Sequence, residues 1–164
     1  MANQDAAFGF KPSRSLVGGS IRNNVYKIAA NYGTSIFSGQ TVEAQAAGGI
    51  EAAAAGDTQQ LGVFGGVQYT DPTSGKPTFK PFYAASTNAA DLEAIVYDDP
   101  QLIFEVQHDG TGTAAMNFSA FDFTGVAGST ISGQSTQELD TSTSGTGGGF
   151  KQLSIVTDPS NDDT

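Results

Sequence analysis

The chain has 164 residues, enough for one domain or for one domain with an ordered arm. It has no cysteine, which excludes disulfides and thiolate chemistry. Its formal net charge of -10 argues against nucleic acid as a partner, because phosphate binding needs a basic surface. No apolar run approaches the roughly 20 residues of a membrane span, and residues 1–10 lack the features of a signal peptide, so no membrane partner is expected.

Charge is divided unevenly along the chain. Residues 1–80 carry six Lys or Arg against five Asp or Glu, whereas residues 81–164 carry one Lys against twelve acidic residues. The first 27 residues hold one acidic residue and four basic ones: Lys11, Arg14, Arg22 and Lys27. This pattern indicates a mildly basic head suited to docking and an acidic rear suited to a solvated surface.

Residues 1–24 show no clear periodicity and contain turn-forming sequences, Lys11-Pro12-Ser13 and Gly18-Gly19-Ser20. We therefore predict an extended N-terminal arm over residues 1–24 that leaves the body and lies on a partner. Burial of one Phe at an interface is worth roughly 1.5–3 kcal/mol, so two Phe residues in the arm would serve as anchors while nearby cations meet carboxylates. The predicted partner-binding residues are Phe8, Phe10, Lys11, Arg14 and Arg22.

Strand signals begin at Val25, and a β domain is predicted over residues 25–157. The clearest strand spans residues 61–69, where Leu61, Val63, Val67 and Tyr69 fall on one face at period two. Gly65 and Gly66 in its middle indicate a bulge or a sharp bend. Residues 79–83 predict a returning strand at a sheet edge, because Pro81 cannot donate a ladder hydrogen bond.

Further short strands follow the same pattern. Residues 50–55 predict a strand end or one helical turn; residues 93–97, 102–106 and 150–156 predict strands. Asp109-Gly110 is typical of a hairpin turn, and residues 158–164 form a polar tail. About eight short strands separated by turns predict an all-β fold, either a small antiparallel β-barrel or a sandwich, almost free of helix.

Residues that could carry chemistry are few. His108 is the single histidine, lies beside a predicted hairpin and has no nucleophile motif around it, so we expect an exposed turn residue. The densest carboxylate group could bind Ca²⁺ or serve glycoside hydrolysis; it consists of Asp98, Asp99, Glu105 and Asp109. The Asp98-Asp99-Pro100 sequence is more simply explained as a turn whose side chains cap backbone amides. No catalytic residue, metal site or cofactor is predicted.

Three segments together resemble a known family. The N-terminus combines Asp5, Phe8-Gly9-Phe10, Lys11-Pro12 and Arg14; residues 52–69 place an Ala-Gly-Asp turn before a Leu-Gly-Val strand; residues 93–110 repeat strand, Asp-Asp-Pro, strand and Asp-Gly. In this order they resemble the capsid decoration, or cement, proteins of tailed bacteriophages. The resemblance implies a non-enzymatic protein that binds and stabilises the outer capsid surface of the virion. Its partners would be the major capsid protein and neighbouring copies of itself, as a dimer or trimer.

Two other functions stay open at this stage. One is a different virion part, such as a head-fibre base or a tail component. The other is a carbohydrate-binding or hydrolytic β domain, which the absence of Trp and the single His disfavour. Copy number relative to the major capsid protein distinguishes capsid from tail.

Overall fold

The computed structural model describes residues 5–57, 59–125, 128–145 and 148–157. The predicted polar tail, residues 158–164, lies outside this part. Within it the chain is all-β, with fourteen mostly short strands and two 3-10 turns of three residues each, Ala114–Met116 and Thr141–Thr143. The prediction of an all-β fold is therefore confirmed. No helix in the described residues is long and apolar enough to cross a membrane.

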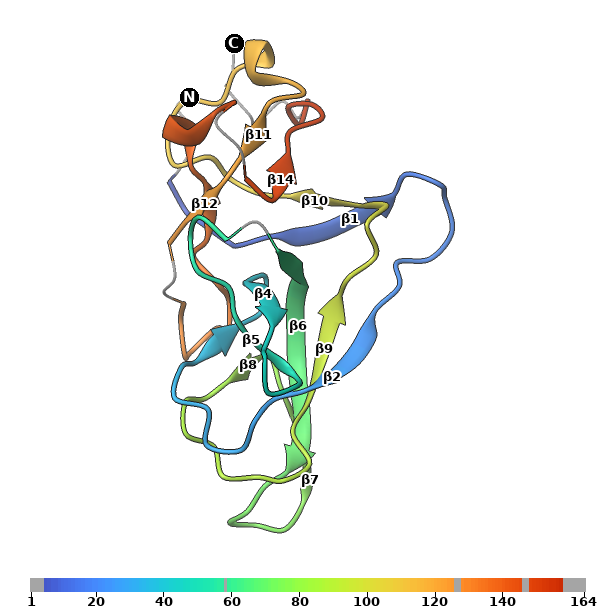
Figure 1. Cartoon of the computed structure of the whole chain (residues 1–164), viewed down its shortest axis with the longest axis vertical. Helices are drawn as coiled ribbons and strands as arrows, with labels where there is room; N and C mark the ends of the chain where they lie inside the picture. Colours follow the sequence, from blue (N-terminus) through green and yellow to red (C-terminus); the bar gives the residue numbers. More distant parts are fainter. Residues whose placement is uncertain (1–4, 58, 126–127, 146–147, 158–164) are drawn as a thin grey trace.

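One six-stranded antiparallel sheet forms the lower part of the molecule in Figure 1. Its path is β2 (Asn24–Lys27), β9 (Glu93–Tyr97), β6 (Gln60–Thr70), β4 (Thr41–Ala44) and β5 (Ile50–Ala52), and β7 (Pro77–Lys80) pairs with the far half of β6. The path ends at β2 and β5, so this sheet is not a closed barrel.

A bulge in β6 divides that strand between two sides of the sheet. The β6–β9 register shifts between Phe64 and Gly66, as the glycine pair predicted. Before the shift, Val63 packs into one hydrophobic cluster; after it, Val67 and Tyr69 pack into another, together with Phe64. The prediction that Val63 and Val67 lie on one face is therefore wrong. The extra residue of the bulge reverses which residues of the strand face each side of the sheet.

Four two-stranded antiparallel sheets complete the fold. β3 and β8 pair beside the large sheet, whereas the other three pairs, β1–β10, β11–β14 and β12–β13, lie at the upper end in Figure 1. Their bounds are β1 (Lys11–Ser15), β3 (Ile36–Phe37), β8 (Phe82–Tyr83), β10 (Leu102–Glu105), β11 (Ala120–Phe121), β12 (Phe123–Thr124), β13 (Glu138–Leu139) and β14 (Phe150–Lys151).

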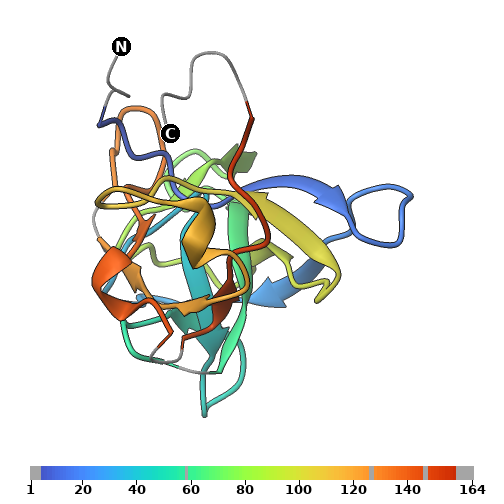
Figure 2. The ribbon, with the colours of Figure 1, turned by 90° about the horizontal axis from the view of Figure 1, so that it is seen from above.

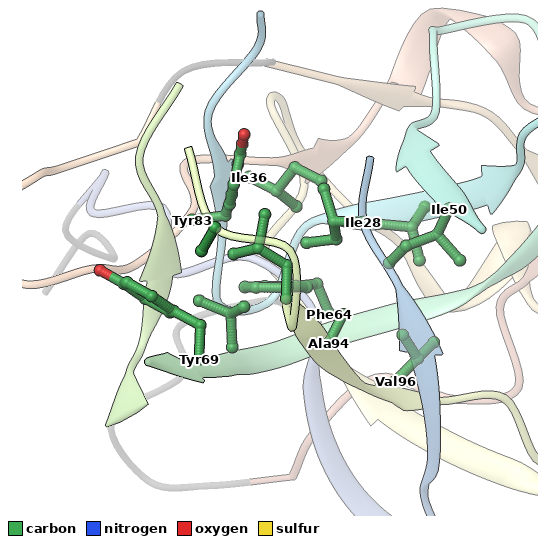
Figure 3. Packing of buried hydrophobic residues seen from close by; sticks show 12 residues of the cluster. Ile28, Ile36, Ile50, Phe64, Tyr69, Tyr83, Ala94 and Val96 are labelled. Carbon is green, nitrogen blue, oxygen red and sulfur yellow. The ribbon is translucent and has the colours of Figure 1, made fainter. Parts of the chain in front are cut away.

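Two hydrophobic cores result from this arrangement. The first, here called the sheet core, packs against the six-stranded sheet (Figure 3) and contains Ile28, Ile36, Val42, Ile50, Phe64, Val67, Tyr69, Tyr83, Ala89, Leu92, Ala94 and Val96. The second, here called the upper core, contains Phe10, Ala53, Val63, Phe121, Phe123 and Leu139, with Phe104, Val106, Met116 and Phe150 packed around it.

A buried amide joins the upper strands to the large sheet. Gln137, just before β13, is fully buried, as is Thr41 at the start of β4. The Thr41 backbone N–H donates to Gln137 Oε1 at 2.8 Å, and Gln137 Nε2 donates to Thr41 Oγ1 at 3.1 Å. Both residues therefore satisfy their polar groups in the interior, which fixes the two regions relative to each other.

The N-terminal segment differs from the predicted free arm. Residues 11–15 form β1, which pairs with β10 from Lys11 opposite Glu105 to Ser15 opposite Leu102. The Phe10 N–H donates to the Gly39 carbonyl at 2.8 Å, so the chain before β1 also lies on the body. Among the described residues of this segment, the loop over residues 16–23 stands away from the body (Figures 1 and 2).

Two smaller predictions also differ from the structure. Asp109-Gly110 does not close a hairpin: the Asp109 N–H donates to the Leu139 carbonyl, and the chain continues into a 3-10 turn. The last predicted strand is short, because only residues 150–151 pair, with β11. Pro81 interrupts the strand predicted over residues 79–83, so that β7 and β8 join different partners.

Candidate binding surface

The loop over residues 16–23, here called the projecting loop, connects β1 to β2. β1 pairs with β10 and β2 pairs with β9, and the loop spans the bend between these two ladders. The Leu16 N–H donates to the Gln101 carbonyl at 2.8 Å, which ends the ladder before the chain turns outward. Gly18 and Gly19 have φ of 78° and 91°, values that favour glycine, and open space surrounds both.

The projecting loop exposes aliphatic side chains. Leu16 is 57% exposed, Val17 77% and Ile21 37%, and Val25 at the start of β2 is 51% exposed. Scattered exposed aliphatic residues are ordinary on a protein surface, but four within ten positions of a single protruding segment form a local apolar surface. Such a surface is suited to contact with another protein.

Two arginines flank this apolar surface. Arg14 and Arg22 are exposed, and neither has an ion pair among the residues that the structure describes. Their basic neighbours are engaged: Lys27 Nζ lies 2.8 Å from Glu93 Oε1, and Lys11 Nζ lies 3.9 Å from Glu105 Oε2. The projecting loop therefore combines aliphatic side chains with two cations that are available to a partner's carboxylates.

A groove of about 1430 Å³ lies next to the loop, between β10, the chain around Phe8 and the C-terminal residues 149–156. Its lining includes apolar residues, and its charged residues are mostly acidic, with five carboxylates from Asp5, Asp98, Asp99, Glu105 and Asp109 against two cations from Arg14 and Lys151. Pockets for small molecules usually measure about 300–1,000 Å³. The groove therefore fits a segment of polypeptide better than a small ligand.

The predicted partner-binding residues are placed in three different settings. Phe10 is only 1% exposed; its ring stacks on Phe150 with centroids 4.2 Å apart and meets the edge of Phe104 at 6.3 Å. It therefore serves the upper core, and its predicted role as an exposed anchor does not fit this conformation. Phe8 is half-buried and lines the groove, and Lys11 pairs with Glu105 of its own chain.

Arg14 and Arg22 are the predicted basic residues that are exposed and have no ion pair with any residue the structure describes, and they flank the apolar part of the projecting loop along the chain. The sequence prediction missed Leu16, Val17 and Ile21 as binding residues. The signal was present, since these aliphatic residues flank a Gly-Gly turn in a stretch without acidic residues. The two nearby Phe residues carry a stronger hydrophobic signal, and the sequence therefore favours them as the anchors.

His108 is half-buried, so the prediction of an exposed turn residue is wrong. Its ring meets Phe121 edge-on at 5.3 Å, and its backbone forms a bridge with Leu139. These contacts place His108 against the upper core, because Phe121 and Leu139 are both members of it. The residue packs there as a partly apolar side chain.

Of the two carboxylates predicted to cap backbone amides, Asp99 does so, whereas Asp98 binds side chains of β2. Asp98 accepts hydrogen bonds from Asn24 Nδ2 and from the Tyr26 hydroxyl, and this second bond raises the pKa of Tyr26. Asp99 accepts the Gln101 backbone N–H at 2.9 Å. Across the described ranges no group of three or more His, Cys, Asp or Glu side chains is arranged to hold a metal ion.

Nothing among protein-family models, curated proteins or solved structures matches this chain. The resemblance to capsid decoration proteins therefore stays a prediction from the sequence, and function is argued from the projecting loop and its surroundings.

Proposed function

We propose that this protein is a non-enzymatic structural component of a tailed-phage virion that binds the outside of the capsid and stabilises it. The observation that supports this proposal most is the projecting loop. It offers aliphatic side chains and two arginines that have no ion pair within the described part of the chain, on a body whose net charge is -10. A surface of this kind serves protein–protein contact, with the aliphatic residues supplying affinity and the arginines orientation.

The rest of the molecule suits the same role. The body is stabilised by two cores that share β6, and of the two architectures expected from the sequence a sandwich fits the open sheet better. In the proposed function, many copies are arranged on a symmetric shell. Individually weak loop contacts then add up to stable attachment, because linked binding events occur at high effective concentration.

Quantitative mass spectrometry of purified particles from the source of this sequence tests the proposal. We expect hundreds of copies per particle, in a fixed ratio to the major capsid protein. A handful of copies would instead support the head-fibre or tail alternative. Complete absence of the protein from washed particles would overturn the proposal of a virion component.

A further inference from the structure

We infer that the projecting loop of one copy inserts into the acidic groove of a second copy, forming a two-fold dimer. The inference deepens the proposed function, on which it rests, by naming a neighbouring copy on the shell as the partner that the loop contacts. The two surfaces involved adjoin on one chain and meet at Leu16: the loop over residues 16–23, and the groove that β10 and residues 149–156 line.

Shape and apolar character match between these surfaces. The loop presents Leu16, Val17 and Ile21 as protruding aliphatic groups. The groove is open, larger than a small-molecule pocket, and its wall includes Leu153 and Val156, which are 36% and 54% exposed. Contact between the two would remove exposed apolar surface from water on both sides, which is the main source of affinity in protein association.

Charge selects a second copy as the occupant. Two chains of net charge -10 repel each other at long range, so association needs a local match of opposite sign. The loop has Arg22 and no acidic residue, whereas the groove is mostly acidic and includes the Asp98–Asp99 turn. Salt at about 0.15 M screens the long-range repulsion beyond roughly 8 Å, while contact pairs persist.

Two-fold symmetry allows both insertions to form at once. Arg14 and Leu16 line the groove at the point where the loop begins, so loop and groove adjoin on each copy. In an isologous interface, contact of the first loop with the second groove is repeated by the second loop and the first groove. The loop and the groove of each copy are then both covered within one interface.

Light scattering coupled to size-exclusion chromatography tests the inference on the full chain. We expect a mass twice that of the 16.8 kDa chain at micromolar concentration, falling on dilution. Replacing Val17 and Ile21 together by Ser should weaken the dimer more than tenfold, because each buried aliphatic side chain is worth about tenfold or more in affinity. Ile131→Ser is the matched control, since Ile131 is 99% exposed in a different turn, and it should leave the dimer unchanged.

A charge exchange tests the assigned groove. Arg22→Glu and Asp99→Lys should each weaken self-association, and an equimolar mixture of the two variants should restore it, with folding of each checked by circular dichroism. A monomer at all concentrations, a dimer indifferent to the Val17/Ile21 change, or a mixture that restores nothing would each overturn the inference. Particle copy number is measured separately from self-association. A chain that does not dimerise can therefore still prove to be a virion protein, and a chain that dimerises can prove to be absent from particles.

Discussion

The sheet core and the upper core bury similar side chains but are built by different means. The sheet core is organised by strands of up to eleven residues, whose alternation brings Val42, Phe64 and Val96 to one side. Apart from the β1–β10 pair, the upper core is surrounded by two-residue strands, and it gathers residues from distant positions, such as Phe10 and Phe121. Regular ladders therefore position the first core, whereas tertiary contacts between otherwise irregular segments hold the second.

Aromatic stacking and side-chain hydrogen bonds replace ladder bonds in the upper region. Asp109 Oδ1 accepts hydrogen bonds from the Thr141 N–H and hydroxyl at 2.8 and 2.7 Å, and the Asp122 N–H donates to Thr143 Oγ1 at 3.0 Å. Phe10 reaches Phe150 across almost the whole length of the sequence. The comparison shows that a segment with little secondary structure can still be part of a folded body.

The largest effect is expected in the sheet core. Phe64→Ala removes a fully buried ring and should lower the free energy of unfolding by about 3–5 kcal/mol, because the rigid sheet cannot close over the cavity. Urea denaturation measures the change. Phe118→Ala, at an exposed aromatic residue, is the control and should alter stability by no more than about 0.5 kcal/mol. Equal effects of the two substitutions would contradict the assignment of Phe64 to a core.

Phe10→Ala should cost slightly less, about 3 kcal/mol, because the half-buried rings of Phe104 and Phe150 can move into the space. Hydrogen exchange should show the loss concentrated in the upper strands, with the six-stranded sheet still protected. The result separates the two regions, since Phe64→Ala should weaken protection in both. A change below about 0.5 kcal/mol would mean that the N-terminal segment is a free arm after all.

Replacement of the buried amide tests the link between the two regions. Gln137→Met keeps the volume but leaves the Thr41 N–H without its acceptor, so the free energy of unfolding should fall by about 1–3 kcal/mol. Gln134→Met, at an exposed position in the same segment, is the matched control and should be neutral. Thermal unfolding monitored by circular dichroism compares the two; an equal effect would contradict the structural role of the amide.

A smaller effect concerns pH. Burial raises the pKa of Glu43 and of Glu138 above the ordinary 4.5, and neighbouring carboxylates add to both shifts. Between 4.5 and these raised values the folded chain binds more protons than the unfolded chain, so stability should increase as pH falls from 7 toward about 5. Urea midpoints across this range measure the trend, and Glu43→Gln should flatten it. A steady loss of stability from pH 7 to pH 5 would contradict the prediction.

Below that range the trend should reverse. Hydrogen bonds lower the pKa of Asp71 and Asp91 from 3.8 and that of Glu93 from 4.5. A carboxylate with a lowered folded pKa contributes stability above its unfolded pKa and loses it as pH falls through the folded value. Stability should therefore decrease below about pH 4, with a maximum between the two ranges.

Local patterns predicted the six-stranded sheet well and the upper region poorly. The sheet strands β6 and β9 follow from short-range alternation and from the turn residues around them, and the bulge follows from Gly65-Gly66; in the upper region the same signals predict β10. Gln137 lies in a Gly/Ser/Thr-rich stretch that shows no strand periodicity. Its burial depends on Thr41, 96 positions away, which no local pattern reports.

The sequence predicted only part of the candidate site, because local patterns do not show which residues the rest of the chain covers. Arg14 and Arg22 are predicted from the basic head of the sequence, and both are exposed and have no ion pair among the described residues. Phe10 was assigned to a partner because hydrophobicity shows that a residue seeks burial, not whether its own chain or another protein covers it. Phe10 is buried in the upper core of its own chain, whereas the aliphatic residues of the projecting loop are exposed.

The central claim is that the projecting loop is the binding element of a virion protein. The loop would act directly on the shell or through pairing of copies. Binding to particles freed of this protein tests the claim. Labelled full-length chain, the Val17→Ser/Ile21→Ser variant and the Ile131→Ser control are compared over a concentration series at physiological salt. We predict that the full-length chain and the control bind alike and that the loop variant needs more than tenfold higher concentration, because two aliphatic contacts are lost. Equal binding by all three proteins would contradict the claim.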